Sequence, residues 1–230
     1  MSNPGDLNNF ISRAMSYCWD ESHGYTNGGM GYPDFDCSGF IGRCLYEAGF
    51  NYPSYHVGTM NMDDNPMSSM NTLGAAGFQL IHVTDLNNIP PLQHGDIFVL
   101  NSYTSDWQAN GGHTFIYCEN IEAYVDAEAY SDVVSTVAHA KVEASSSRGE
   151  TSPGDHRRDG TGAYWEVWCH AYAILVSSYY DPQDPDYNNY VTIARWNGIN
   201  PLKEIMFLKR IRDGQFNNDN WANKFMKRGI

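Results

Sequence analysis

The sequence predicts a single α+β domain in which helices are followed by an antiparallel sheet. Apolar residues recur at helical spacing mainly within the first 50 residues, and short runs rich in β-branched and aromatic residues follow from residue 78 onward. Segregation of helices from strands is typical of the α+β class. No linker cleanly divides the 230 residues, so we expect one domain over residues 1–230.

Two helices are expected near the N-terminus. The first spans residues 5–19, where one face is apolar: Leu7, Phe10, Ile11, Ala14, Met15 and Cys18. The second begins at Cys37 and ends near Gly49, because Gly28-Gly29 and Pro33 keep the preceding segment from being helical. Residues 51–75 are rich in Asn, Asp, Met and Pro, which predicts a long surface loop with short helical pieces.

Strands are expected in the rest of the chain, where turn signals separate short apolar runs. The predicted strands are 78–83, 96–100, 113–118, 123–129, 142–147, 165–176 and 204–211. Residues 147–162 and 177–190 are polar and are expected to form loops, and the last residues a polar tail with a short helix. We expect residues 131–230 to complete or decorate the sheet.

Charge and cysteine usage exclude several classes of protein. The formal net charge is −13 without a cluster of basic residues, so nucleic acid is an improbable partner. No apolar run approaches the ~18 residues of a membrane span, and no secretory signal is visible, so synthesis in a cytoplasm is expected. The five cysteines have no CxxC spacing, which argues against a disulfide framework or a thiolate zinc site. We expect neither a metal nor a cofactor.

The segment FDCSGF places Cys37 in the first turn of the second predicted helix. Unpaired backbone N–H groups and the positive end of the helix dipole favour the thiolate there. The same N–H groups can hold the oxyanion that forms when a thiolate attacks a carbonyl. Cys37 is therefore the candidate nucleophile.

His113 is the candidate general base, because it opens an apolar strand after Gly111-Gly112, which leave space beside the imidazole. The remaining histidines are weaker candidates: His23, His56, His82, His94, His139, His156 and His170. A third group should hold the imidazole in its tautomer. If residues 123–129 pair with the His113 strand as a hairpin, Asp126 or Glu128 lies on the face beside it, and we favour Asp126.

Four motifs in this order, FDCSGF, LQHGDIFVL, GGHTFIYC and YVDAEA, with the upstream Tyr25-Thr-Asn-Gly-Gly turn, resemble the NlpC-type papain-like peptidoglycan hydrolases. The resemblance covers residues 5–130 and is greatest to bacteriophage endolysins. It implies an N-terminal helical part whose nucleophile helix packs on a central antiparallel sheet. It also implies that Tyr25, Asp36 and Ser38 shape the substrate and oxyanion site. The third catalytic residue of this family is usually His, Asn or Gln, and Asp126 at this position departs from that pattern.

The resemblance implies a cysteine peptidase or amidase. It would cut a stem-peptide amide or the muramoyl-L-alanine bond of bacterial peptidoglycan through a thioester, without a cofactor. Such an enzyme would reach the cell wall from the host cytoplasm through a holin or by virion delivery. No separate wall-binding domain is visible. Two alternatives stay open: a papain-like transglutaminase, deamidase or acyltransferase toxin, and a non-catalytic phage structural protein that keeps the fold.

Overall fold

The computed structural model describes residues 5–19, 23–119, 139–145, 163–167 and 180–198. Its helices and strands are α1 (Leu7–Trp19), α2 (Cys37–Glu47), η1 (Thr59–Asn61), α3 (Thr72–Ala76), β1 (Phe78–Val83), η2 (Leu86–Asn88), β2 (Ile97–Thr104), β3 (Ala109–Glu119), β4 (His139–Ala144), β5 (Ala163–Val167) and β6 (Tyr187–Trp196). The α+β class is confirmed, and the two N-terminal helices lie where the sequence predicts them. The chain divides into compact units at 1–197 and 198–230, and all these elements belong to the first.

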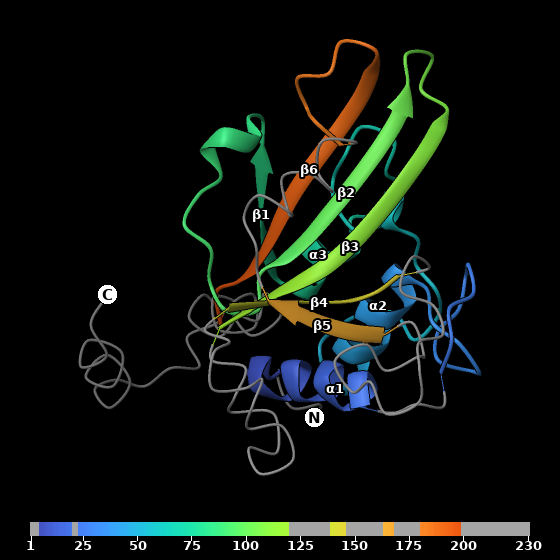
Figure 1. The fold of residues 1–230 in the computed structure, drawn as a ribbon, viewed down its shortest axis with the longest axis vertical. Coiled ribbons are helices and arrows are strands. Elements are labelled where there is room, and N and C mark those ends of the chain that lie inside the picture. The colour runs from blue at the N-terminus through green and yellow to red at the C-terminus, as the bar shows by residue number, and fades with distance from the viewer. Residues whose placement is uncertain (1–4, 20–22, 120–138, 146–162, 168–179, 199–230) are drawn as a thin grey trace, which may run out of the picture. The chain divides into compact units, whose positions relative to one another are not determined.

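The six strands form one antiparallel sheet in the order β1-β6-β2-β3-β4-β5 (Figure 1). β6 lies between β1 and β2, although it is the last described strand in sequence. The prediction of a loop over residues 177–190 is therefore wrong from Tyr187 onward. Asn188 and Asn189 disguise the start of this strand, whose apolar alternation becomes regular only at Val191 and Ile193. The predicted strands 123–129 and 204–211 lie outside the described residues.

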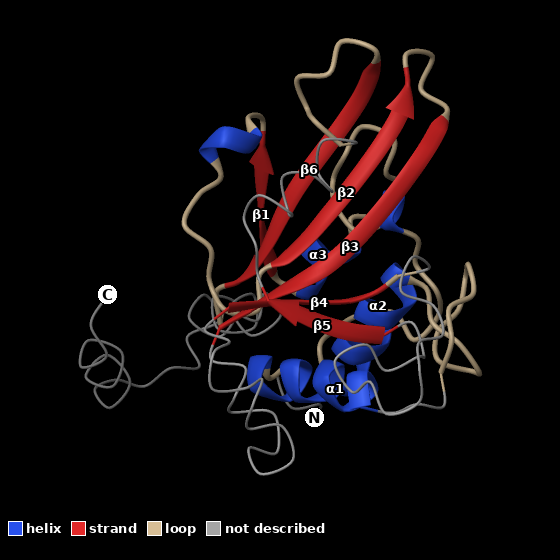
Figure 2. Ribbon diagram, in the orientation of Figure 1, coloured by secondary structure: helices blue, strands red, loops and turns tan. Residues whose placement is uncertain are grey.

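Two apolar clusters bury the faces of the sheet. The larger one joins α1 and α2 to Ile97 and Val99 of β2 and to β4, and the second gathers Phe98, Leu100 and Phe115 with apolar residues of β1 and β6. Helices α1 and α2 pack against each other, and α2 also packs on β3 and β4. Figure 2 shows the two helices near β4 and β5. No helix within the described ranges is long and apolar enough to cross a membrane.

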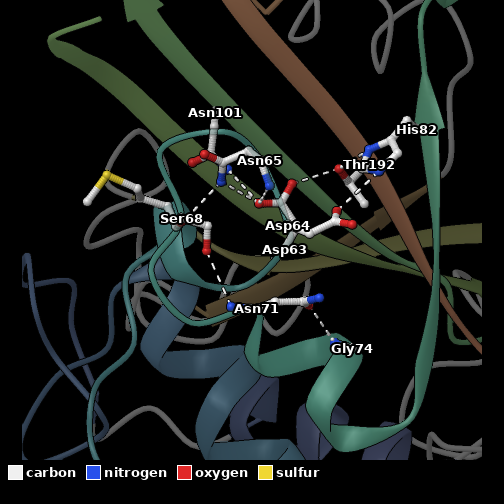
Figure 3. Close-up of polar contacts among 10 residues, drawn as sticks. Asp63, Asp64, Asn65, Ser68, Asn71, Gly74, His82, Asn101 and Thr192 are labelled. Carbon is white, nitrogen blue, oxygen red and sulfur yellow. Dashed lines mark hydrogen bonds and ion pairs between the residues drawn. The ribbon is translucent and has the colours of Figure 1, made fainter.

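A buried polar cluster fixes the long loop after α2 to the sheet (Figure 3). Asp63, which is fully buried, accepts hydrogen bonds from Asn65 Nδ2 at 2.6 Å and from Thr192 Oγ1 of β6 at 2.7 Å. The hydroxyl of Tyr103 on β2 donates a further hydrogen bond of this cluster to Oδ1 of Asn65 at 2.8 Å. Because these side chains satisfy one another away from water, the loop has one defined position against β2 and β6.

Candidate active site

The first turn of α2 is held by the carboxylate of Asp36, which accepts four hydrogen bonds. Oδ1 accepts from the N–H of Gly39 at 2.6 Å and from Ser38 Oγ at 2.9 Å. Oδ2 accepts from the N–H of Gly28 at 2.7 Å and contacts His56 Nε2 at 2.8 Å. Asp36 is thus the N-cap of α2 and also ties the preceding glycine turn to the helix. Burial alone would raise the pKa of Asp36, but these bonds outweigh it and hold the pKa below its usual value.

Gly39 lets the helix begin in contact with that turn. A Cβ at Gly39 would lie 1.8 Å from the carbonyl oxygen of Gly29. We expect Gly39→Ala to lower the free energy of unfolding by about 3 kcal/mol, since backbone would have to move. Gly58→Ala is the matched control, because nothing lies within 4 Å of its added Cβ and its φ is −66°. Urea denaturation of the two variants checks this, and equal midpoints would contradict it.

Tyr25 lies beside the nucleophile candidate, as the resemblance implies. Its backbone forms a bridge with Phe35, and its side chain is close enough to Cys37 to interact with it electrostatically. Burial, and then the nearby Cys37 and Asp36, raise the pKa of the Tyr25 hydroxyl, so it is a neutral O–H donor near neutral pH. The hydroxyl and the helix-terminal N–H groups form one polar surface next to the sulfur.

His113 is held from the side of β4. Its backbone pairs with Leu100 of β2, and its Nε2 lies 2.6 Å from Oε2 of Glu143. The other oxygen of Glu143 pairs with Nζ of Lys141 at 2.8 Å, and this ammonium also lies over the Phe115 ring. The Glu143 and Lys141 side chains are only 2% and 5% exposed. Both carboxylate oxygens therefore have cationic partners in a dry environment, which fixes the carboxylate.

The imidazole of His113 interacts with the thiol of Cys37, and this interaction contributes to a raised pKa of His113. Since Nε2 of His113 faces Glu143, its Nδ1 remains for the sulfur. Burial would lower the pKa of His113, but the charge of Glu143 and the hydrogen bonds to Cys37 and Glu143 raise it to about 10. Burial would likewise raise the pKa of Glu143, and the charges and hydrogen bonds of His113 and Lys141 instead lower it to about 2. The site is therefore arranged for an imidazolium beside a carboxylate.

The His113–Glu143 pair should make stability depend on pH at both ends. Because the pKa of Glu143 is lowered, its contribution is present above its ordinary value of 4.5 and is lost as pH falls toward 2. Because the pKa of His113 is raised, its contribution is complete below 6.5 and is lost as pH rises through 10. About 3 kcal/mol of unfolding free energy should disappear on the acid side. Thermal midpoints across pH check this, and Glu143→Gln should flatten both limbs.

The structure brings together five of the predicted site residues: Tyr25, Asp36, Cys37, Ser38 and His113. Asp126 and Glu128 lie outside the described residues. The carboxylate that the structure places on His113 is Glu143, which the sequence reasoning did not single out. The Lys-Val-Glu pattern in a short strand puts Lys141 and Glu143 on one face, and this pattern could have indicated a charged pair that faces the His113 strand.

His56 was one of the weaker histidine candidates, and no pattern in the sequence distinguishes it from the others. Within the described ranges, no three His, Cys, Asp or Glu side chains gather so as to hold a metal ion. No family model matches the chain, and no curated protein matches it in sequence.

Proposed function

We propose that the chain is a cysteine-dependent amide hydrolase of the papain-like NlpC type that acts on bacterial peptidoglycan, as endolysins do. The observation that carries the catalytic part is the Cys37 thiol at a helix N-terminus, in contact with His113, whose other nitrogen is held by buried Glu143. A nucleophile, a base and a group that orients the base are the three parts that covalent acyl transfer needs. The substrate class depends on the order of the four motifs and the upstream turn.

In the proposed reaction, Cys37 is the thiolate of an ion pair with the His113 imidazolium, and this thiolate attacks the carbonyl carbon of the scissile amide. The Tyr25 hydroxyl and N–H groups of the first turn of α2 face the developing oxyanion. His113 then donates its proton to the departing amine, leaving a thioester on Cys37. Water, deprotonated by His113, attacks the thioester and releases the carboxylate and the thiol. Glu143 keeps the imidazole oriented throughout.

Digestion of purified walls tests the proposal. Walls of several cross-link types are incubated with the protein, and the released fragments are identified by mass spectrometry together with their new amino groups. We expect one kind of amide to be cut, with one new amine for each new carboxyl group. An isopeptide formed between added amines and glutamine side chains, without wall cleavage, would instead assign the transglutaminase reaction.

Metal removal should leave the reaction unaffected, because every proposed step uses side chains of the chain itself. We expect equal initial rates of wall digestion before and after dialysis against EDTA. Prior treatment with iodoacetamide should abolish digestion. Loss of activity in EDTA with recovery on adding a divalent cation would contradict the thiol mechanism.

A further inference from the structure

The loop between α2 and η1 places a second imidazole next to the nucleophile. His56 Nε2 lies 2.8 Å from Oδ2 of Asp36 and 3.3 Å from Oγ of Ser38. The His56 side chain is 32% exposed, whereas that of Asp36 is 5% exposed. A titratable group in contact with solvent is thus paired with a buried carboxylate one residue before Cys37.

That carboxylate has two effects on the site. It caps α2, which positions the sulfur, and it also places a negative charge beside the atom that must become a thiolate. A neighbouring like charge disfavours ionisation. A cation on Asp36 removes this penalty and leaves the hydrogen bonds of the cap in place.

We propose that His56 is a positioning residue whose imidazolium, held on Asp36, compensates the charge of this carboxylate and so favours the thiolate of Cys37. The inference deepens the proposed function and partly rests on it. It concerns the reactivity of the thiol, which can be measured without any substrate.

Few other charged groups surround this pair. Among the described residues, those that face His56 are the Asp36 carboxylate and the Ser38 hydroxyl, both at the start of α2. Tyr25, from the glycine turn, and His113, from β3, contact Cys37 itself. Behind His113, on β4, Glu143 and Lys141 offset each other. His56 is therefore the cation that directly faces Asp36.

The charge of His56 varies with pH in a definite direction. Its hydrogen bond to Asp36 raises the pKa of His56 above its usual value, against a smaller opposing effect of burial. Below that pKa the imidazolium covers the carboxylate. As pH rises through it, the neutral ring keeps a hydrogen bond but the compensation is lost. The charge of Asp36 is thus compensated below the raised pKa of His56, and this compensation is lost above it.

The test measures alkylation of Cys37 by iodoacetamide between pH 6 and 9, followed by mass spectrometry of the peptide that contains it. His56→Gln keeps a hydrogen-bond donor but no charge, and His56→Arg keeps a charge that does not titrate. His82→Gln is the matched control, because His82 also pairs with an aspartate, Asp64 at 3.1 Å, but on β1, three strands from β3. Alkylation of fully buried Cys44 reports any unfolding.

We expect His56→Gln to alkylate about three- to tenfold more slowly than wild type at pH 6–7 and to converge with it near pH 9. His56→Arg should match wild type at neutral pH and exceed it at pH 9, and His82→Gln should follow wild type throughout. Parallel profiles for all four proteins would overturn the inference, as would a slower Gln variant in which Cys44 has become reactive.

Failure of the inference and failure of the proposed function are distinguishable. Unchanged alkylation profiles in proteins that still cut walls would refute the role of His56 alone. The expected profiles in proteins that release no wall fragment would support His56 and refute the peptidoglycan substrate.

Discussion

Cys37→Ala is expected to abolish wall digestion, with a loss of at least about 10⁴-fold in initial rate. Among the described residues that interact with His113, only Cys37 can form a thioester, and the N–H groups and Tyr25 can only stabilise an oxyanion once it has formed. Cys37 is 6% exposed, and the first turn of α2 is held by the carboxylate of Asp36 and not by the thiol. The variant should therefore keep the wild-type circular dichroism spectrum and thermal midpoint. Release of fragments from purified walls measures the rate.

Cys44→Ala is the matched control, because Cys44 lies two turns further along the same helix and is fully buried. It should lower stability by about 1–2 kcal/mol, as the loss of a small buried side chain does, and leave the rate per folded molecule unchanged. A Cys37→Ala protein that digests walls at a wild-type rate would rule out thiol catalysis.

Glu143→Gln is expected to reduce the rate by about 10²- to 10⁴-fold, the range seen when the group that orients a catalytic histidine loses its charge. The single amide oxygen cannot accept from both His113 and Lys141, which are 2.6 and 2.8 Å from the two carboxylate oxygens. One of the two cations must then face an N–H donor. An unpaired buried ammonium should also lower the free energy of unfolding by about 3–5 kcal/mol.

The double variant Lys141→Met/Glu143→Gln separates catalysis from folding. It removes the unpaired ammonium, so it should recover much of the stability, while the uncharged amide still supports His113 poorly and the rate stays low. Asp126→Asn is the comparison for the sequence-based assignment and should reduce the rate far less than Glu143→Gln. A larger loss of rate in Asp126→Asn than in Glu143→Gln would contradict the assignment of Glu143 as the group that orients His113. Activity should be normalised to the folded fraction of each protein.

The N-terminal half could be predicted from the sequence because its signals are local. The apolar spacing after Cys37 and the glycines before it define the start of α2, and the motif that contains His113 reads as a strand. Two strands are longer than predicted: β2 continues to Thr104 instead of ending at residue 100, and β3 begins at Ala109 instead of at His113, so the two form a long hairpin. The polar and glycine residues at the ends of β2 and β3 obscured the pairing of these two strands, because strand pairing depends on the partner strand and not only on local propensity.

The carboxylate on His113 was harder to predict because its position depends on strand pairing. Glu143 reaches the imidazole since Val142 pairs with Ile116 in register, and nothing in the sequence gives the partner of a short strand. His56 is similar: 18 residues separate it from Ser38, and only the anchored loop returns it to the start of α2. Long-range pairing of this kind has no single-sequence signature.

The position of β6 between β1 and β2 has a consequence for synthesis. β1 and β2 are both made about a hundred residues before β6, and each pairs with it along its length. Until the ribosome has released that segment, a nascent chain holds two strands with open edges and no complete sheet, so folding depends on sequence-distant contacts and should be slow. A premature stop before residue 187 would leave those edges permanently exposed, and the fragment should aggregate.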